Sequence, residues 1–379
     1  MQNKRKHILF LSSWYPSRIL SDNGDFIQRH AQAVALKHDV TVVHAIKDPL
    51  LKTAKFKVEQ NYHKGVNEII VYCKPALFKP FNLVYILQAF LEGIKLVKPF
   101  KVIHLNVVYP AGLIAVYLKY KYKLPVILTE HWTHLHQNKF NKLPKYKQFA
   151  IKKILNAIDL ALPVSDHLGK SLQKINAKVN YQVIPNVVSL QLFRPKSIST
   201  SGKKRFLHLS HLGDEHKNIT GMLNVAKQLA ENGYLFEFYI GGNTNLNGIK
   251  SFINQHQLTD FVFPFGKINH CDVNQEMKKS DCFVLFSRFE NQPCVQAEAF
   301  ASGIPIIATN VGGVNEFLPQ DFGILIDSEN EEQLYQAMKE VIEGKVFATA
   351  NQLSEYAKAQ FSEESIANQY HQIYNQFLK

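Results

Sequence analysis

The stretch SRFENQPCVQAEAFASGIPIIATNVGGVNE (Ser287–Glu316) decides the fold that the sequence predicts for this chain. A short apolar run, CFVLF (Cys282–Phe286), precedes it and is typical of a buried parallel strand. Pro293 suits the first turn of a helix that reads CVQAEAFAS, and Gly303 suits its end. A second apolar run, IPIIAT, then leads into two glycines at 312–313. The pattern predicts strand, loop, helix, strand and loop, which is the repeating unit of an open α/β sheet.

Two glutamates of this stretch are candidates for binding a ligand. Glu290 falls in the loop at the carboxyl end of the first predicted strand, and Glu298 falls about one turn into an otherwise apolar helix. Ligands of open α/β sheets bind outside the carboxyl ends of the strands. Carboxylates at that edge are well placed to accept hydrogen bonds from ligand hydroxyls, so we expect a binding site there. A glutamate in an apolar helix can also be a paired structural carboxylate. The surrounding pattern favours ligand binding over this structural role for Glu298.

The composition fits a soluble globular chain of two domains. The chain has 379 residues, of which 46% are hydrophobic and 20% charged. Its four cysteines show no paired spacing of the metal-binding kind, and no stretch approaches the roughly 20 apolar residues of a membrane span. The apolar run near the start is too short for a secretory signal and reads as a first strand. We therefore expect a cytoplasmic protein with reduced thiols.

Positive charge is concentrated in the first half of the chain. Residues 1–188 contain 28 Lys and Arg against 10 Asp and Glu, whereas the remainder has a net charge of −5. Two lysine-rich segments, Tyr117–Lys123 and Lys139–Lys153, interleave lysines with aromatic residues. Lysine runs are commonly just solvated faces, but the asymmetry favours peripheral contact with an anionic membrane at its inner surface. Nucleic acid is the weaker alternative, because no recognised binding motif accompanies the charge.

Alternating strand and helix patterns form two blocks along the chain. The polar segment after Phe193, RPKSISTSGKKR, predicts an interdomain linker. We place an N-terminal, acceptor-side domain at residues 1–190 and a C-terminal, nucleotide-binding domain at 191–361, with a last helix (362–379) packing back on the first domain. The segment KVEQNYHKGVNEIIVYCKP predicts a β-hairpin, and VNYQVIPNVVSLQLF is expected to add a strand. These blocks imply two doubly wound parallel sheets facing across a cleft. No G-x-G-x-x-G fingerprint occurs, which weakens a dehydrogenase reading.

These motifs, taken together, resemble those of a known family. The two glutamates with seven residues between them resemble the signature of retaining glycosyltransferase family 4, whose members have the GT-B fold of two Rossmann-like domains. The resemblance extends along nearly the whole chain and is closest to bacterial enzymes that build surface polysaccharides. It includes the N-terminal glycine loop (WYPS with NGDFIQRHAQAVA), LTEHW, VIPNVVSLQLF, the phosphate-binding segment HLSHLGDEHKN, and the later loops YIGG and FPFG. The aspartate that is usual in the segment VIPNVVSLQLF is missing, with Ser189 nearby.

The resemblance implies roles for individual residues. Glu298 would bind the ribose diol of a nucleotide-sugar donor, Glu290 would hold hydroxyls of the transferred sugar, and His131 would lie near the reacting carbon. Lys217 would contact the diphosphate as a point charge. The family's arginine before that lysine is absent, and Ser210 or His211 stands in its place. His131 and Glu290 are thus the catalytic candidates. The remaining donor-binding candidates are glycines and loop residues whose N–H groups can approach the ligand: Gly24, Gly241, Gly242, Ser287, Asn291, Gln292, Gly312 and Gly313.

The implied reaction moves a sugar from a UDP- or GDP-linked donor to a glycan or lipid-linked glycan, with retention of the anomeric configuration. The donor is a co-substrate, and no other cofactor is implied. We expect no metal site, since Lys217 and helix ends can carry the phosphate charge and no Asp-x-Asp motif occurs. Three histidines close together (His131, His134 and His136) could suggest a metal site, but histidine-rich loops are more often solvated or structural, so a metal site is the less favoured interpretation. Two alternatives stay open: a non-catalytic nucleotide-sugar-binding subunit, and a nucleotide-sugar 2-epimerase of the same fold.

Overall fold

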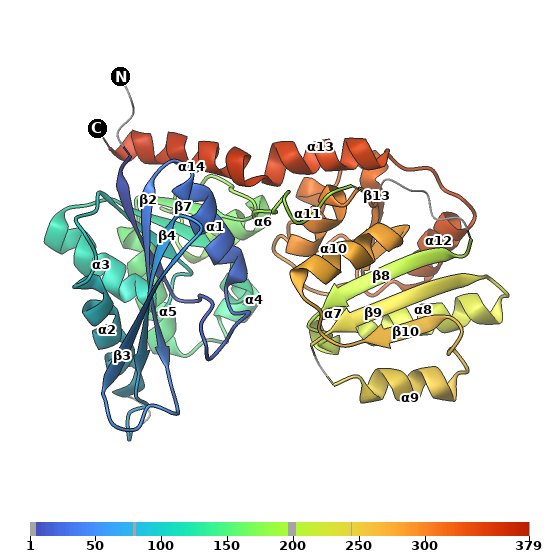
Figure 1. The fold of residues 1–379 in the computed structure, drawn as a ribbon, viewed down its shortest axis with the longest axis horizontal. Coiled ribbons are helices and arrows are strands. Elements are labelled where there is room, and N and C mark those ends of the chain that lie inside the picture. The colour runs from blue at the N-terminus through green and yellow to red at the C-terminus, as the bar shows by residue number, and fades with distance from the viewer. Residues whose placement is uncertain (1–4, 79–80, 196–201, 244, 379) are drawn as a thin grey trace. The chain divides into compact units, whose positions relative to one another are not determined.

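The computed structural model describes residues 5–78, 81–195, 202–243 and 245–378. The chain divides into a first unit, Met1–Val187 with Glu363–Lys379, and a second unit, Val188–Ser362. Each unit is built on one mainly parallel sheet with helices on its faces (Figure 1). The linker expected after Phe193 falls partly on residues 196–201, which lie outside the described residues.

The first unit has a seven-stranded sheet in the order β3-β4-β2-β1-β5-β6-β7. The strands are β1 (His7–Ser12), β2 (Asp39–Lys47), β3 (Phe56–His63), β4 (Val66–Cys73), β5 (Val102–Asn106), β6 (Val126–Glu130) and β7 (Leu160–Pro163). Adjacent strands pair in parallel except β3, which pairs antiparallel with β4 at the edge. The central strands are buried on both sides, which explains why they read as continuous apolar runs.

Helices cover both faces of this sheet. The helices of the first unit are α1 (Asp25–Ala35), α2 (Phe81–Ile94), α3 (Ala111–Tyr122), α4 (Gln137–Phe140), α5 (Lys145–Ala157), α6 (Asp166–Ile175) and α14 (Glu363–Phe377), with a 3₁₀ turn η1 (Thr133–Leu135). The apolar core on one face is closed by α2, α3, α5 and α6, and the core on the other by α1 and α14. The last helix therefore packs against α1, although the whole second unit separates them in the sequence.

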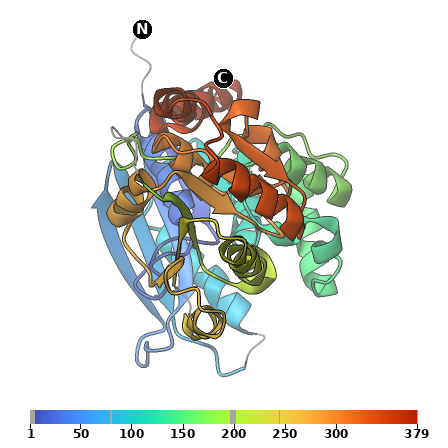
Figure 2. The same ribbon diagram turned by 90° about the vertical axis from the view of Figure 1, so that its right-hand side faces the viewer.

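The second unit has a six-stranded sheet in the order β10-β9-β8-β11-β12-β13. Its strands are β8 (Lys204–Ser210), β9 (Phe236–Gly242), β10 (Val262–Phe265), β11 (Cys282–Leu285), β12 (Ile306–Thr309) and β13 (Gly323–Ile326). Its helices are α7 (Asp214–Lys217), α8 (Ile219–Glu231), α9 (Asn247–Gln255), α10 (His270–Lys279), α11 (Cys294–Ala301), α12 (Glu331–Ile342) and α13 (Ala350–Phe361), with 3₁₀ turns η2 (Asn315–Phe317) and η3 (Gln320–Phe322). One face is closed by α8, α9 and α12 (Figure 2).

Each sheet reverses its strand order once. In the first unit the reversal lies between β1 and β5, and in the second it lies between β8 and β11. Such a reversal opens a crevice at the carboxyl ends of the two strands, because their following helices leave on opposite faces. The fold class predicted from the sequence, two doubly wound parallel sheets, is confirmed.

Some local predictions differ from the structure. The hairpin is confirmed as β3 and β4, but the segment VNYQVIPNVVSLQLF forms two isolated parallel bridges, Tyr181 with Ala161 and Val188 with Ser362, and no strand. Gln182 N and Ile184 N donate hydrogen bonds of 3.0 and 3.1 Å to Ala161 O and Pro163 O, and these bonds to β7 stop before Pro185. The sequence analysis also missed α5, α13 and β13. The start of α13 has a capping box between Thr349 and Gln352, a T-x-x-Q signal that was available in the sequence.

Within the described part of the chain, none of the helices combines the length and the apolar character needed to cross a membrane.

Candidate donor-binding site

The stretch that decides the fold supplies one wall of the candidate site in the second unit. Helix α11 begins at Cys294, so Pro293 is its N-cap and not its first residue. Gly303 follows the helix with φ 75°, as a glycine after a helix end does. The loop after β11 carries Glu290, and the segment after β8 carries Lys217. These two strands flank the reversal of the sheet, where a ligand crevice is expected.

Lys217 and Glu290 form an ion pair across this reversal. Lys217 Nζ lies 2.5 Å from Glu290 Oε1, and their side chains are only 13% and 10% exposed. A pair this buried is costly to desolvate, and it is far more sensitive to loss of one partner than a surface pair. The sequence analysis predicted both residues for the site but gave them separate ligand contacts. The structure brings them into direct contact.

The two glycines at 312–313 hold the Glu290 loop at close range. Gly312 has φ 59°, and a Cβ built on it would lie 1.7 Å from the carbonyl oxygen of Glu290. Gly313 N donates a hydrogen bond of 2.7 Å to Asn291 O. Position 312 therefore requires glycine for a packing reason, whether or not its N–H also meets a phosphate. The same close approach fixes the height of Glu290 above the sheet.

The glycines at the end of β9, the strand beside β8, also allow close packing that a side chain would prevent. A Cβ on Gly242 would lie 2.2 Å from Ser210 O, and one on Gly241 would lie 2.3 Å from the ring of Phe265. The end of β9 thus packs directly against the end of β8 and against β10. Ser210, one of the two residues considered for the position of the family's arginine, uses its hydroxyl to accept a hydrogen bond from Leu212 N. It shapes the loop after β8 and supplies no cation.

The remaining predicted residues of the second unit are buried around Glu290. Glu298 lies on α11 and is 4% exposed, and Ser287, Asn291 and Gln292, in the loop between β11 and that helix, are also buried. Thr309 Oγ1 donates a hydrogen bond of 2.6 Å to Ser287 O, which ties the end of β12 to the start of this loop. Buried hydrogen-bonding side chains are thus present both in the loop before α11 and on α11 itself, and pockets for polar ligands use such groups.

The predicted residues of the first unit also lie near each other. Gly24 is the N-cap of α1 with φ 78°, and its neighbour Phe26 stacks obliquely on His131, with ring centroids 4.5 Å apart. A Cβ on Gly24 would lie 2.8 Å from the backbone of Trp14, so glycine is required there. The ends of β1 and β6 and the start of α1 thus converge at one edge of the first sheet.

His131 is held by a buried carboxylate that the sequence analysis did not single out. Glu130 Oε1 accepts hydrogen bonds of 2.8 Å from the backbone N–H groups of His131 and Trp132, and Oε2 accepts one of 2.9 Å from Val108 N. Burial raises the pKa of Glu130 to about 7, although these three donors act in the opposite direction. Burial also lowers the pKa of His131 well below its usual value, so its imidazole is neutral at pH 7.

Behind His131 lies a buried polar network that reaches the last helix. The His30 ring centroid is 5.4 Å from that of His131, and His30 Nδ1 lies 2.9 Å from the hydroxyl of Tyr370 on α14. The same hydroxyl lies 3.2 Å from Thr129 Oγ1, which in turn contacts His104. Only the pairing of distant segments creates this network, so no local pattern in the sequence could have indicated it. Among the described residues, no three His, Cys, Asp or Glu side chains are grouped as metal ligands require.

Comparison with known proteins agrees with this architecture. The profile of the family described as Glycosyltransferase Family 4 matches residues 27–192, and that of Glycosyl transferases group 1 matches residues 191–360. The chain is 25% identical to the putative teichuronic acid biosynthesis glycosyltransferase TuaC of Bacillus subtilis, over 98% of this chain and 99% of that protein. It is also 25% identical to the alpha-monoglucosyldiacylglycerol synthase of Streptococcus pneumoniae, over 67% of this chain and 62% of that protein. The chain therefore covers less than two thirds of this second relative.

Solved structures share the fold. Sucrose-phosphate synthase from Thermosynechococcus elongatus superposes with a TM-score of 0.78 at 19% identity, covering 98% of this chain and 99% of that one. Anabaena Alr3699/HepE, solved in complex with UDP, gives a TM-score of 0.73 at 15% identity over 98% and 100% of the two chains. With two family profiles meeting at residues 191–192 and together spanning most of its length, the chain belongs to the glycosyltransferases of the GT-B fold, with a Glycosyltransferase Family 4 half followed by a Glycosyl transferases group 1 half.

Proposed function

We propose that this glycosyltransferase moves a sugar from a nucleotide-sugar donor to a glycan or lipid-linked glycan, with retention of configuration and without a metal ion. The observation that carries the proposal is the buried Lys217–Glu290 pair at the strand reversal of the second unit. A nucleotide sugar presents a diphosphate and a set of hydroxyls. A lysine and a carboxylate side by side offer one partner for each.

In this reaction the residues position the substrates and stabilise charge, and none of them forms a covalent bond to the sugar. The bond between the anomeric carbon and the diphosphate oxygen breaks, a bond to the acceptor oxygen forms on the same face, and the acceptor's proton passes to the leaving diphosphate. Lys217 offsets the charge that develops on the diphosphate, and Glu290 orients the sugar through its hydroxyls. Glu298 would hold the ribose, and neutral His131 would contact the sugar as a hydrogen-bonding group. Gly312 and Gly313 maintain the loop geometry in which Glu290 meets Lys217.

Donor turnover tests the catalytic role. A thermal-shift screen of UDP- and GDP-linked sugars selects the donor, since a ligand that binds only the folded state raises the melting temperature. Release of nucleoside diphosphate from that donor is then compared between wild type and Glu290→Ala. We expect the variant to lose release while still folding. Equal background release by both proteins would refute catalysis and favour a non-catalytic binding subunit, and conversion of the donor sugar without an acceptor, seen by NMR, would reveal an epimerase.

For the acceptor, the proposal rests on a basic and aromatic surface of the first unit. Helices α3 and α5 pack together and expose aromatic side chains that are 46% to 71% accessible: Tyr117, Tyr120, Tyr122, Tyr146 and Phe149. Lysines lie over these rings, with Lys121 Nζ 5.2 Å from the ring centroid of Tyr122 and Lys153 Nζ 5.4 Å from that of Phe149. Aromatic rings with basic neighbours suit the interface of an anionic bilayer, where each basic residue contributes about 1 kcal/mol. The surface would bring the enzyme to a lipid-linked acceptor.

Vesicle sedimentation tests this contact. The protein is expected to bind vesicles that contain phosphatidylglycerol, to bind phosphatidylcholine vesicles much less, and to be released by salt. Lys121→Glu with Lys152→Glu should abolish binding. The matched control is Lys203→Glu with Lys250→Glu, which makes the same charge change at exposed sites of the second unit. If wild type fails to bind anionic vesicles at low salt, or if the control loses binding equally, the proposed membrane contact is wrong.

A further inference from the structure

Lys217 lies on a helix that is too short to be stable by itself. Helix α7 is a single turn of four residues, and none of them is buried. It ends at Asn218, which has φ 51° and at the same time caps the next helix, α8. Lysine is a flexible point charge on a four-carbon stem, so the position of its backbone decides where the charge goes. None of its four residues is buried, so polar contacts contribute strongly to holding this turn, beside the ring contact of His216 with Phe289.

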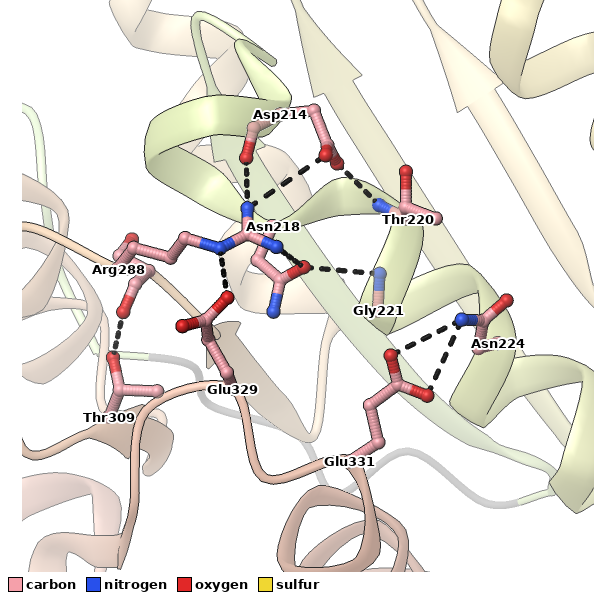
Figure 3. Close-up of polar contacts among 10 residues, drawn as sticks. Asp214, Asn218, Thr220, Gly221, Asn224, Arg288, Thr309, Glu329 and Glu331 are labelled. Carbon is pink, nitrogen blue, oxygen red and sulfur yellow. Dashed lines mark hydrogen bonds and ion pairs between the residues drawn. The ribbon is translucent and has the colours of Figure 1, made fainter.

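Those contacts come from Arg288, two residues before Glu290. Its backbone N donates a hydrogen bond of 2.8 Å to His216 O. Its guanidinium Nη1 donates to Asp214 O at 2.5 Å, and Nη2 donates to Asn218 Oδ1 at 2.7 Å (Figure 3). Arg288 therefore contacts α7 at its first residue, Asp214, at its third residue, His216, and at Asn218, the cap that follows it.

Arg288 is itself fixed from the opposite side. Its Nε donates a hydrogen bond of 2.7 Å to Glu329 Oε1, in the loop between β13 and α12 (Figure 3). Glu329 has φ 60°, an uncommon conformation for a residue with a side chain, and its carboxylate faces the guanidinium. All three nitrogens of the guanidinium are thus engaged, and the planar group joins α7 and its cap to the loop of Glu329, which is distant in sequence.

The cap contacts extend this arrangement into α8. Asp214 Oδ1 accepts a hydrogen bond of 2.7 Å from Thr220 N, and Asn218 Oδ1 accepts one of 3.3 Å from Gly221 N (Figure 3). The oxygen of Asn218 that caps α8 is the same atom that Arg288 contacts. Displacement of the guanidinium would therefore weaken both the α7 turn and the first turn of α8.

We propose that Arg288 is a positioning residue that sets Lys217 against Glu290 and, through Lys217, against the donor diphosphate. The side chain acts on the backbone of α7 and does not itself contact the donor. It thereby gives the loop of Glu290 and the turn of Lys217 a fixed spacing. The part that concerns the diphosphate rests on the proposed function, whereas the part that concerns the Lys217–Glu290 pair does not.

Two substitutions separate the geometry from the charge. Arg288→Gln removes the fork that reaches Asp214, Asn218 and Glu329 together, and Arg288→Lys keeps the charge but not the fork. Arg205→Gln is the matched control, because Arg205 is another partly buried, ion-paired arginine of the same unit and pairs with Glu276 on α10. Glu329→Gln provides a milder perturbation of the same contact.

The first readout needs no ligand. The non-additivity of the melting-temperature losses of Lys217→Met and Glu290→Gln is measured in three backgrounds: wild type, Arg288→Gln and Arg205→Gln. We expect the coupling to fall to near zero with Arg288→Gln and to persist with Arg205→Gln. Coupling that is unchanged by Arg288→Gln would overturn the proposal, whatever the protein's activity.

The second readout is the dissociation constant of the nucleoside diphosphate of the donor. Arg288→Gln is expected to weaken it by about 10- to 100-fold, and Arg288→Lys by a similar factor because charge alone does not restore the fork. In the Lys217→Met background Arg288→Gln should add little, since it acts through that lysine. Additive losses would show that Arg288 contacts the phosphates directly and would overturn the positioning role. If wild type binds no nucleoside diphosphate, the proposed function fails, and the first readout still decides the role of Arg288.

Discussion

Lys217 Nζ and Glu290 Oε1 are 2.5 Å apart, although 73 residues separate them in the chain. No local feature of the sequence around either residue brings the two side chains together. The meeting follows from the sheet order, in which β8 and β11 are neighbours, and from the loops that leave their carboxyl ends. A cation for a diphosphate and a carboxylate for hydroxyls are thereby held in one place, and a bound donor would take each as a partner.

The first prediction concerns the stability of this pair. Because both side chains are nearly buried, Lys217→Met leaves a buried carboxylate alone and should lower the free energy of unfolding by about 3–5 kcal/mol. The double variant Lys217→Met, Glu290→Gln should be less destabilised than the sum of the single variants. The pair Lys345–Glu340 is the control, since it is 2.6 Å long but 39% and 48% exposed. Breaking it should cost about 1 kcal/mol or less, measured by denaturant unfolding. Equal costs at the two pairs would contradict this prediction.

Gly312 allows a prediction with a close internal control. Gly312→Ala places a methyl group against Glu290 O and also forces alanine to a φ of 59°. Gly233→Ala imposes similar strain at φ 78°, but nothing lies within 4 Å of the new atom. Left-handed strain costs about 1–2 kcal/mol at either site. Only Gly312→Ala should displace the Glu290 loop and reduce donor turnover strongly, and comparable turnover in the two variants would show that the contact is unimportant.

The last helix should stabilise the first unit through its buried hydroxyl. Tyr370→Phe removes the partner of His30 Nδ1 and Thr129 Oγ1 while keeping the ring. Thr129 Oγ1 keeps His104 as a partner, whereas His30 Nδ1 is left unpaired, which should cost about 1–3 kcal/mol, seen as a lower melting temperature. Tyr62→Phe is the control, because Tyr62 is 77% exposed on the edge strand β3. A loss no larger than that of Tyr62→Phe would show that the network adds nothing to stability.

Acid should destabilise the protein through its buried histidines. Burial lowers the pKa values of His30, His38 and His44 to about 4. In the unfolded chain they titrate near 6.5, so between these values the unfolded state binds more protons and stability falls as the pH falls. Each shift corresponds to at most about 3 kcal/mol. Glu130 acts in the opposite sense, because its raised pKa of about 7 makes the folded state bind the extra proton. Three histidines outweigh one carboxyl.

The measurement is the melting temperature between pH 7 and pH 4.5, in wild type and in His44→Gln. Wild type should lose stability steadily toward acid. His44→Gln removes one titrating group and should make the decline shallower, while Gln can still donate to Ser12 O, which His44 Nδ1 contacts at 2.8 Å. A melting temperature that is flat over this range, or a slope that His44→Gln leaves unchanged, would contradict the assignment of the acid sensitivity to these rings.

The sequence was sufficient for the fold because the fold depends on periodic features. Apolar runs that alternate with amphipathic helices predict a parallel sheet wherever they occur, and the chain has two such series. The segment that contains Pro185 was predicted as a strand from its apolar content, yet its backbone hydrogen bonds to β7 stop at Ile184 and it forms only isolated bridges. Helix α13 was missed although Thr349 and Gln352 form its capping box, because its apolar periodicity is weak beside that of its neighbours.

The site was only partly predictable. Motif spacing could indicate Glu290, Glu298 and Lys217, since Glu290 and Lys217 follow recognisable strands and Glu298 lies on the helix after one of them. The functions of Arg288 and Glu130 could not be inferred, because they consist of hydrogen bonds to backbone groups of other segments. A charged residue next to a motif looks the same in the sequence whether it faces solvent or holds a neighbouring turn.

The central claim is that the Lys217–Glu290 pair is the donor site, and calorimetric titration of the nucleoside diphosphate of the preferred donor tests it most directly. Lys217→Met should weaken binding by about tenfold or more, because it removes the phosphate's cation. Glu290→Gln should bind at least as tightly as wild type, because it releases Lys217 from its carboxylate partner, and yet it should not transfer sugar. Equal affinity in wild type and Lys217→Met, or loss of nucleoside diphosphate binding on Glu290→Gln, would contradict the account.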